Sequence, residues 1–213
     1  MRDIPMFATE NGIGSLILKD IPYSGNGYVN IFDASNMEAF LEECHDFCKM
    51  AGAKNLYISG KDVPDKHPLH TEIWIMECPS CKFESTDAIL VPVDDSNAEK
   101  WREIYNNRMA DVPTAAFMSG ARVEKLLNEG NACLIYRDKT LLGIGAVSEN
   151  RVDCIASAFD GAGRDVLLAL CSILSGESVE LEVASANERA ISFYRKLGFQ
   201  KIGIKENWYK YVP

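Results

Sequence analysis

The chain has 213 residues, of which 47% are hydrophobic and 25% are charged, and its formal net charge is −9. This length suits one domain of ordinary size together with a smaller module. The acidic balance and the lack of a Lys/Arg run argue against a nucleic-acid partner, because binding to a phosphate backbone needs clustered positive charge.

The lengths of the apolar runs and the number of cysteines argue against a membrane-spanning protein and against a secreted protein with disulfides. No apolar run approaches the roughly 18 residues that a membrane-spanning helix needs. The N-terminal residues also lack the basic start and apolar block of a secretory signal. The seven cysteines are an odd number, so we expect reduced thiols rather than a disulfide framework. We therefore expect a cytoplasmic protein with no membrane and no nucleic-acid partner.

The first part of the chain has the element order strand, strand, helix, strand, strand. The sequence Ser-Gly-Asn-Gly at 24–27, between two apolar runs, is typical of a hairpin turn. Ser35 or Asn36 can cap the helix that follows, and Gly52 would end it. We predict a helix at about 36–51 and strands at 15–19, 28–32, 55–59 and 71–77.

The chain divides near residues 79–86, where a polar stretch follows the sequence Cys-Pro-Ser-Cys. The second part has the order β-α-α-β-β-β-α-β-α-β-β. Its central strand–helix–strand unit implies parallel neighbours, the hairpin before it implies antiparallel pairing, and a mixed sheet covered by helices follows. We predict strands at 88–93, 133–137, 141–147, 152–159, 179–183, 199–204 and 208–212, and helices at 97–109, 120–128, 164–174 and 187–197.

A turn with the sequence Asp-Gly-Ala-Gly, at 160–163, joins a strand of buried character to a helix. Glycines let the backbone curl so that several N–H groups point at one spot, and the N-terminus of the helix adds partial positive charge. Together these features favour the binding of a diphosphate. The alternative is that the glycines only serve a tight turn.

The run at 181–199 is more specific. A strand ends, Asn187 begins a helix, and Ala190, Tyr194 and Leu197 share one face of that helix. An ordinary amphipathic helix would explain this spacing but not the whole combination, which also includes a terminating Leu-Gly-Phe sequence.

This run resembles the GNAT superfamily of N-acetyltransferases, in which Asn, Ala and Tyr at these spacings are followed by Leu-Gly-Phe. It is similar in particular to the ribosomal-protein alanine N-acetyltransferases. There a Leu-Glu-Val strand, here at 181–183, precedes the same run, and the Asn-Trp-Tyr sequence at 207–209 is similar as well. The resemblance covers 87–213, roughly 60% of the chain.

The resemblance implies an α/β (α+β) fold of the GNAT type. Its sheet is mixed and mostly antiparallel, with a central pair of parallel strands that splay apart and with helices on both faces. We assign 83–213 to the N-acetyltransferase domain. Residues 1–82, whose element order matches the second half of such a domain, are expected to form a smaller, degenerate GNAT-like half-domain. Because no Gly-x-Gly turn precedes its helix, we expect this half-domain to bind no CoA.

By this resemblance, the domain would transfer an acetyl group from the cosubstrate acetyl-CoA to a primary amine of a small molecule or a peptide N-terminus. The strand at 152–159 would contact the pantetheine arm, and the turn at 161–166 would hold the diphosphate. The cofactor-binding residues that the resemblance implies are Ile155, Ala156, Ser157, Gly161, Ala162, Gly163, Arg164, Asp165, Val166, Asn187 and Ala190. Asp160 stands where the family usually has Arg, and Asp165 where it has a small residue. Two carboxylates at this place would repel a diphosphate.

The resemblance also implies a catalytic pair, Glu182 and Tyr194. Glu182 would remove a proton from the amine through a water, because an alkylamine with a pKa of about 10.4 is charged at neutral pH. Tyr194, a phenol, would donate a proton to the leaving thiolate. Glu149 and Asp153 are reserve candidates for the base. The alternatives are that Glu182 is only a surface carboxylate and that Tyr194 is only a core aromatic residue.

The Cys-x-x-Cys sequence at 78–81 has the spacing of a zinc knuckle. A second pair of ligands would have to come from Cys44 and Cys48 or from His67 and His70. Since Cys44 and Cys48 lie on a helix face that we expect to be buried, we predict unligated thiols and no metal site.

Two other readings stay open beside the active enzyme. One is a catalytically weak GNAT-like module that binds an acyl-CoA or a protein, which Asp160 and Asp165 favour. The other is a zinc-dependent interaction protein. The acceptor pocket is expected to draw on 113–120, the hairpin strands and 208–209. The sequence leaves the acceptor amine and the formation of a homodimer undecided.

Overall fold

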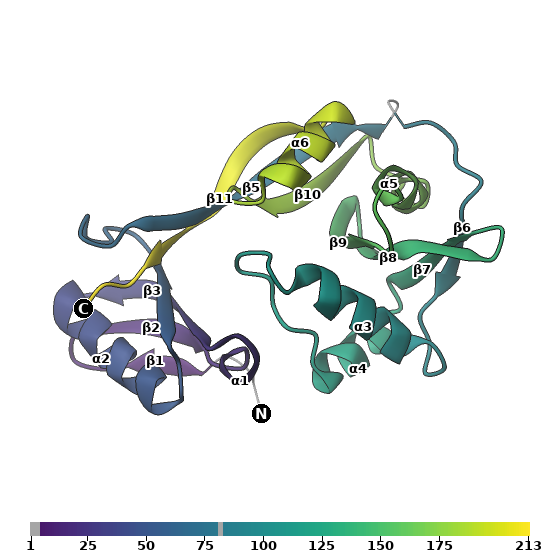
Figure 1. Ribbon diagram of the computed structural model, residues 1–213. Helices are drawn as coiled ribbons and strands as arrows, with labels where there is room; N and C mark the ends of the chain where they lie inside the picture. Colours follow the sequence, from purple (N-terminus) through teal and green to yellow (C-terminus); the bar gives the residue numbers. More distant parts are fainter. Residues whose placement is uncertain (1–4, 81–82) are drawn as a thin grey trace. The chain divides into compact units, whose positions relative to one another are not determined.

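The computed structural model describes residues 5–80 and 83–213 and divides by internal contacts into two compact units. The N-terminal unit comprises Met1–Ile73 with Ile204–Pro213, and the C-terminal unit comprises Trp74–Gly203. Both divisions fall inside long strands, β5 (Leu69–Pro79) and β11 (Gln200–Lys210), so each of these strands contributes residues to both units (Figure 1).

The N-terminal unit is a small sheet with one helix packed on it. Its strands lie in the order β1-β2-β3-β4-β11. Their core contains Leu16, Val29 and Ile58 beneath Phe40 and Leu41 of the helix. The elements are β1 (Met6–Ala8), β2 (Gly12–Ile17), α1 (Ile21–Ser24), β3 (Asn26–Ala34), α2 (Met37–Met50) and β4 (Asn55–Ser59). The helix α2 begins where predicted, because the Asn36 side chain accepts a hydrogen bond from the Ala39 N–H.

The C-terminal unit is a larger mixed sheet with the strand order β11-β5-β10-β9-β8-β7-β6. Pairing is antiparallel from β6 to β9, and β9 and β10 are parallel. The elements are β6 (Ile89–Pro92), α3 (Ala98–Met109), α4 (Gly120–Glu129), β7 (Ala132–Arg137), β8 (Thr140–Ser148), β9 (Arg151–Ser157), α5 (Gly163–Cys171), β10 (Ser178–Ala184) and α6 (Glu188–Lys196).

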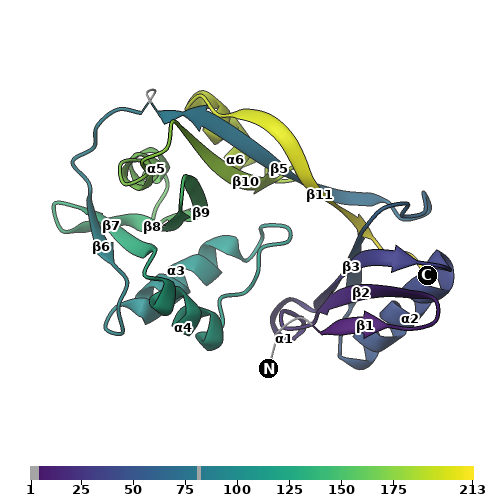
Figure 2. The ribbon, with the colours of Figure 1, turned by 180° about the vertical axis from the view of Figure 1, so that it is seen from behind.

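Two apolar cores lie on opposite faces of this larger sheet. On one face the almost entirely buried α5, with Val166 and Leu170, packs together with Ile191 and Tyr194 of α6. On the other face Trp101 of α3 packs against strand residues such as Ile144. Figures 1 and 2 show α5 on one side of β8 and β9 and α3 with α4 on the other. The expected fold, a mixed sheet with helices on both faces, is confirmed.

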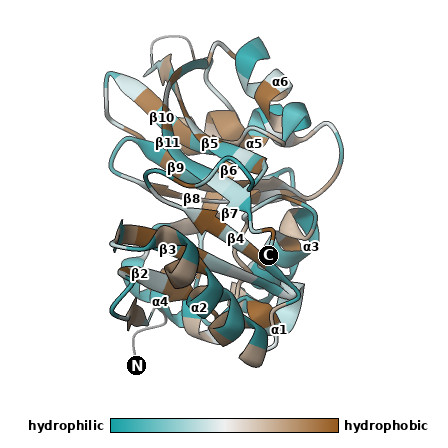
Figure 3. Cartoon of the chain, turned by 90° about the vertical axis from the view of Figure 1, so that its left-hand side faces the viewer, coloured by the Kyte–Doolittle hydropathy of each residue, from teal (hydrophilic) through white to brown (hydrophobic). Residues whose placement is uncertain are grey.

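Amphipathic helices supply these faces. The helix α6 buries Ile191 and Tyr194 and keeps its charged residues outside; Figure 3 shows hydrophilic and hydrophobic segments along it. Gly198, with φ of 96°, follows its last turn in a left-handed conformation that glycine adopts without strain.

Two predicted features differ in the structure. The closing strands expected at 199–204 and 208–212 form one strand, β11, because no Gly or Pro at 204–208 interrupts the extended chain. The expected hairpin forms, since β2 and β3 pair antiparallel, but its connection is the short helix α1 rather than a tight turn at 24–27. Gly25, with φ of 71°, ends this helix, and Asn26 already belongs to β3. Pro22 fits the first turn of that helix, where its missing N–H costs nothing.

Candidate functional site

The parallel strands β9 and β10 pair only at their beginnings. The register joins Arg151 to Glu180 and Val152 to Leu181, and no later pair continues it, although β9 extends to Ser157. The strands therefore part towards their carboxyl ends, as the resemblance implied. Beyond this point one edge of β9 has main-chain groups that β10 does not use, and these are available to a ligand.

A β-bulge lies in β9 next to the place where the strands part. In the pairing with β8, Ala146 is opposite Cys154 but Val147 is opposite Val152, so Asp153 is the extra residue. After the bulge, the residues at 155–157 pair regularly with Gly145, Ile144 and Gly143 of β8. The predicted pantetheine contacts Ile155, Ala156 and Ser157 thus lie on a strand that is held on one edge and open on the other.

The turn between β9 and α5 presents main-chain donors. Gly161 has φ of 98°, a conformation that side-chain-bearing residues rarely adopt. The N–H groups of Ala162 and Val166 donate to Phe159 O and Ala162 O. The first-turn N–H groups of the helix, at 163–165, have no acceptor within the helix, as its geometry requires. A helix N-terminus with donors of this kind favours an anion.

The two aspartates of this turn are paired with arginines. Asp160 lies 3.1 Å from Arg189 Nη2 of α6 and 3.8 Å from Arg108 Nη1 at the end of α3. Asp165 lies 2.9 Å from Arg137 Nη1, and its hydrogen bond is the main cause that raises the pKa of Arg137 above its ordinary value. Each aspartate of the turn therefore has an arginine partner, and Arg137 is shared between Asp165 and Asp87, which lies 2.6 Å from its Nε.

Tyr194 projects from α6 into the core at the gap between the strands. Its side chain is 8% exposed and packs with Phe193 and Phe199, whose ring centroids lie 5.4 and 5.8 Å away. Burial raises the pKa of its phenol well above the ordinary value, and the nearby Cys154 thiol of β9 adds to this effect. The phenol is therefore a protonated donor at neutral pH, and its place satisfies both the catalytic and the core-aromatic interpretation.

Glu182 faces the other side of the sheet. Its neighbours Leu181 and Val183 are buried in the core that contains Tyr194, so alternation along β10 directs Glu182 away from that core. Its carboxylate accepts a hydrogen bond from Arg151, with 3.4 Å between Oε1 and Nη1. The predicted acid and base thus flank the parting strands from opposite faces.

Arg151 is the residue at this site that sequence reasoning missed. It also donates to Asp153 Oδ1 at 2.7 Å, and this hydrogen bond is the main cause that raises its pKa. One guanidinium therefore holds Glu182 together with Asp153, a reserve candidate for the base. The other reserve candidate, Glu149, lies at the β8–β9 turn with φ of 50°. Arg151 could be linked to Glu182 only once the pairing of β9 with β10 was known, because that pairing places Arg151 opposite Glu180.

Asn187 caps α6, since its side chain accepts a hydrogen bond from the Ala190 N–H at 3.1 Å. The cap explains why the helix begins there. It leaves the amide nitrogen of Asn187 for a second contact, so the two roles expected from the sequence are compatible.

The residues expected to form the acceptor pocket fall partly in each unit, and each set is described within its own unit. In the C-terminal unit, Asn106 of α3 holds the loop before α4 through two hydrogen bonds with the Met118 main chain, at 2.8 and 3.1 Å. In the N-terminal unit, Trp208 is 5% exposed and packs edge-on against Tyr28, with 5.2 Å between ring centroids.

Strands β3 and β4 of the N-terminal unit show the opposite of the parting in the C-terminal unit. They are parallel and paired without interruption from Asn26–Asn55 to Asn30–Ser59.

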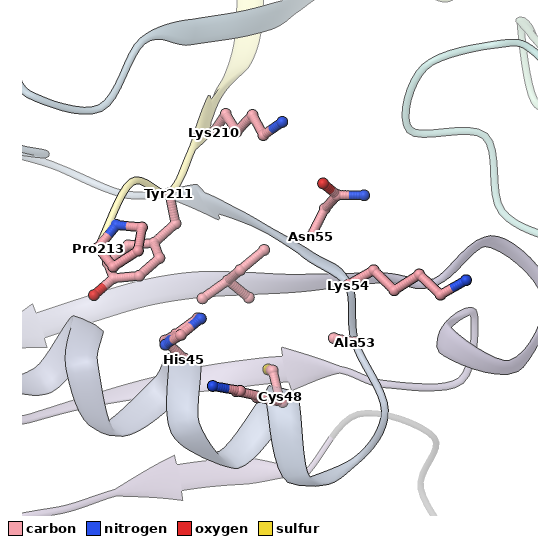
Figure 4. A pocket seen from close by; sticks show the side chains of 10 residues that line it. His45, Cys48, Ala53, Lys54, Asn55, Lys210, Tyr211 and Pro213 are labelled. Carbon is pink, nitrogen blue, oxygen red and sulfur yellow. The ribbon is translucent and has the colours of Figure 1, made fainter.

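A separate cavity of about 310 Å³ lies between α2, the start of β4 and residues 210–213. Figure 4 shows the ammonium groups of Lys54 and Lys210 at this cavity pointing away from Tyr211. No predicted site residue lines it.

The zinc reading has no assembled ligand set in the structure. Cys78 is buried in the C-terminal unit and donates weakly to Leu197 O, whereas Cys44 and Cys48 are buried in the N-terminal unit. Cys81 lies outside the described residues. Within 5–80 and 83–213, no three His, Cys, Asp or Glu side chains come together as metal ligands would. Nor does any helix in these ranges have the length and apolar character needed to cross a bilayer.

Comparison with known proteins gives a partial match in sequence and extensive matches in fold. No protein-family model matches the chain. A segment of 50 residues is 38% identical to the N-alpha-acetyltransferase RimI of Mycobacterium tuberculosis and covers 24% of this chain and 32% of that protein. The chain thus matches about a third of this relative's length.

Two solved structures match nearly the whole chain. A GCN5-related N-acetyltransferase from Sphaerobacter thermophilus has a TM-score of 0.57 at 12% identity, over 94% of this chain and 75% of that one. A tandem GNAT protein from the clavulanic acid biosynthesis pathway has a TM-score of 0.55 at 13% identity, over 98% and 82%. At such identities these structures are informative about the fold alone.

Proposed function

Because the chain has the fold of the GCN5-related N-acetyltransferases, we propose that it transfers an acetyl group from acetyl-CoA to a primary amine. The acceptor class is a small molecule or a peptide N-terminus. The observation that carries the proposal is the parting of β9 and β10 beside the N-terminus of α5. A cytoplasmic location is part of the same proposal.

The residues present fit the cosubstrate. The open edge of β9 at 155–157 offers main-chain groups to the amides of a pantetheine arm. The first-turn N–H groups of α5 offer donors to a diphosphate, and the positive φ of Gly161 lets the chain turn closely around it. When bound, acetyl-CoA supplies an acetyl group activated as a thioester.

The chemistry assigned to this chain's own residues is proton transfer. Glu182, exposed at the edge of the gap, accepts a proton from the incoming amine through a water. Tyr194, kept protonated by burial, donates a proton to the departing sulfur. The unused main-chain donors of β9 stabilise negative charge that develops on the carbonyl oxygen.

Residues 1–82 are proposed to form a degenerate GNAT-like half-domain and residues 83–213 the catalytic domain. The compact units of the structure divide elsewhere, after Ile73, and Ile204–Pro213 belongs to the N-terminal unit. Its β3–α2–β4 segment has the same parallel strand–helix–strand arrangement as β9–α5–β10. The coverage of 98% of this chain by a tandem GNAT protein supports the idea. The uninterrupted pairing of β3 and β4 leaves no opened strand edge for a pantetheine arm.

A second candidate function is a catalytically weak module that binds an acyl-CoA. The hydrogen bond from Arg151 to Glu182 favours it, because a carboxylate oxygen occupied by a guanidinium is less available to the water that would carry the proton of the amine. A thiol-release assay with acetyl-CoA and a panel of amines, polyamines and peptides separates the two candidates. Release of CoA that depends on the acceptor supports the enzyme. Binding of acetyl-CoA without any acceptor-dependent release supports the module.

A further inference from the structure

Asp160 stands at the proposed diphosphate turn and brings two arginines to it from separate helices. Arg189 Nη2 lies 3.1 Å from Asp160 Oδ1, and Arg108 Nη1 lies 3.8 Å from the same oxygen. Arg108 is further fixed by donating from Nη2 to Ala158 O at 2.7 Å. One carboxylate thus gathers two guanidinium groups beside the first turn of α5.

The charge at this place has the sign that an anion needs. Asp160 contributes one negative charge and the two arginines contribute two positive charges, so the three side chains together carry one net positive charge. Asp165, the other acid of the turn, lies 2.9 Å from Arg137, which also pairs with Asp87 at 2.6 Å. Arg164 of the first turn pairs with Glu84 at 2.9 Å. Over these eight side chains the charges balance, so the positive excess is confined to the group of Asp160, Arg108 and Arg189. In a chain of net charge −9, a neutral surround with two exposed guanidinium groups on one carboxylate is still favourable for an anion at the N-terminus of a helix.

The exposure of these ion pairs makes the arginines available to a ligand. The Arg189 and Asp160 side chains are 83% and 75% exposed, and Arg108 is 39% exposed. Ion pairs this exposed to water contribute little to stability, so the guanidinium groups can turn from the carboxylate to a phosphate at little cost. Guanidinium groups also form strong, paired hydrogen bonds with phosphate oxygens.

We propose that Arg108 and Arg189 are diphosphate-binding residues, assembled at the turn by Asp160. The inference rests on the proposed function and extends it, because neither arginine belongs to the turn itself. Arg108 comes from the end of α3 and Arg189 from the first turn of α6, so binding would join both helices to the β9–α5 turn.

The test is calorimetric titration of the full chain with acetyl-CoA and with 3′-dephospho-acetyl-CoA, which keeps the diphosphate. Arg108→Gln and Arg189→Gln are each expected to weaken binding of both ligands about tenfold. The matched controls are Arg102→Gln on α3, which pairs with Glu99, and Arg195→Gln on α6, which lies over the Trp74 ring. These controls are expected to bind like the unchanged protein.

The charge-conserving variants Arg108→Lys and Arg189→Lys guard against a folding effect. We expect them to bind more tightly than the Gln variants but less tightly than the unchanged protein, because an ammonium keeps the charge and cannot form the paired hydrogen bonds of a guanidinium. Unchanged affinity in both Gln variants would overturn the inference while leaving the proposed function intact. A loss that appears with acetyl-CoA but disappears with the 3′-dephospho ligand would also overturn it, since the contact would be with the 3′-phosphate. Failure of the unchanged protein to bind either ligand would refute the proposed cosubstrate itself, and the inference with it.

Discussion

Arg151 Nη1 lies 3.4 Å from Glu182 Oε1, where β9 and β10 still pair and just before they part. The same guanidinium holds Asp153, the extra residue of the β9 bulge, at 2.7 Å. Arg151 therefore holds both the proposed base, Glu182, and the bulge residue Asp153 in place. This relationship makes the pH dependence of the reaction a sensitive test of the roles assigned here.

Replacing Glu182 with Gln is expected to lower turnover about 10²- to 10⁴-fold, the usual contribution of a positioned general base. The acid limb of the pH–rate profile should be absent in the Glu182→Gln variant. The measurement is the rate of thiol release between pH 5 and 10. Glu180→Gln, on the same strand and the same face, is the control and should keep both the rate and the limb. An unaltered profile in Glu182→Gln would place the base elsewhere.

Replacing Arg151 with Gln should shift the acid limb to higher pH by about one unit. The reason is that Asp153 and Glu182 would lose their shared cation and repel each other, so that protonation of either becomes easier. The raised pKa of Arg151 means that this cation is present over the whole working range of pH. Arg102→Gln serves as a control, and a limb that stays in place would show that Arg151 does not act through Glu182.

Tyr194→Phe should reduce kcat about 10²-fold and leave the affinity for acetyl-CoA nearly unchanged. Because burial raises the pKa of the phenol well above its ordinary value, no descending limb from this group should appear below about pH 10. Single-turnover and binding measurements on the variant separate the two effects. Tyr105→Phe, on α3, whose ring stacks on Trp101, is a matched control. Full turnover in Tyr194→Phe would leave Tyr194 with only its core role.

Gly143→Ala should destabilise the C-terminal unit by about 2 kcal/mol. A Cβ at Gly143 would lie 2.4 Å from Ala156 O and 2.7 Å from Val166 Cγ2. Both neighbours belong to elements of the site, so the strand or the helix would have to move. Gly203→Ala, which would meet nothing within 4 Å, is the control. Urea unfolding gives the difference, and equal midpoints for the two variants would contradict the packing described.

The sequence predicted the fold where local signals and apolar periodicity agreed. Asn36 and Asn187 begin α2 and α6 as caps, and the apolar residues of α5 make it a buried helix. The resemblance to the GNAT superfamily is confirmed in the fold. By contrast, the sequence predicted two strands where the structure has the single strand β11. The residues that pair with a strand are far away in the sequence, so local patterns do not show how far it extends.

For the site, the resemblance of the sequence indicated the parting strands and the turn. It did not indicate the arginines that pair with the aspartates of the turn. The interaction of Asp160 with Arg108 and Arg189 joins residues 52 and 29 positions apart, and nothing local in the sequence indicates such pairs. The roles of Glu182, Tyr194 and the cofactor-binding residues stay predictions.

We propose that acetyl-CoA binds where β9 and β10 part, next to the N-terminus of α5. The most direct test is the melting temperature of the full chain with and without acetyl-CoA at about 1 mM. A ligand that binds only the folded state at a hundred times its Kd stabilises it by about 2.7 kcal/mol, so we expect the melting temperature to rise by several degrees. An unchanged melting temperature would show that acetyl-CoA does not bind there.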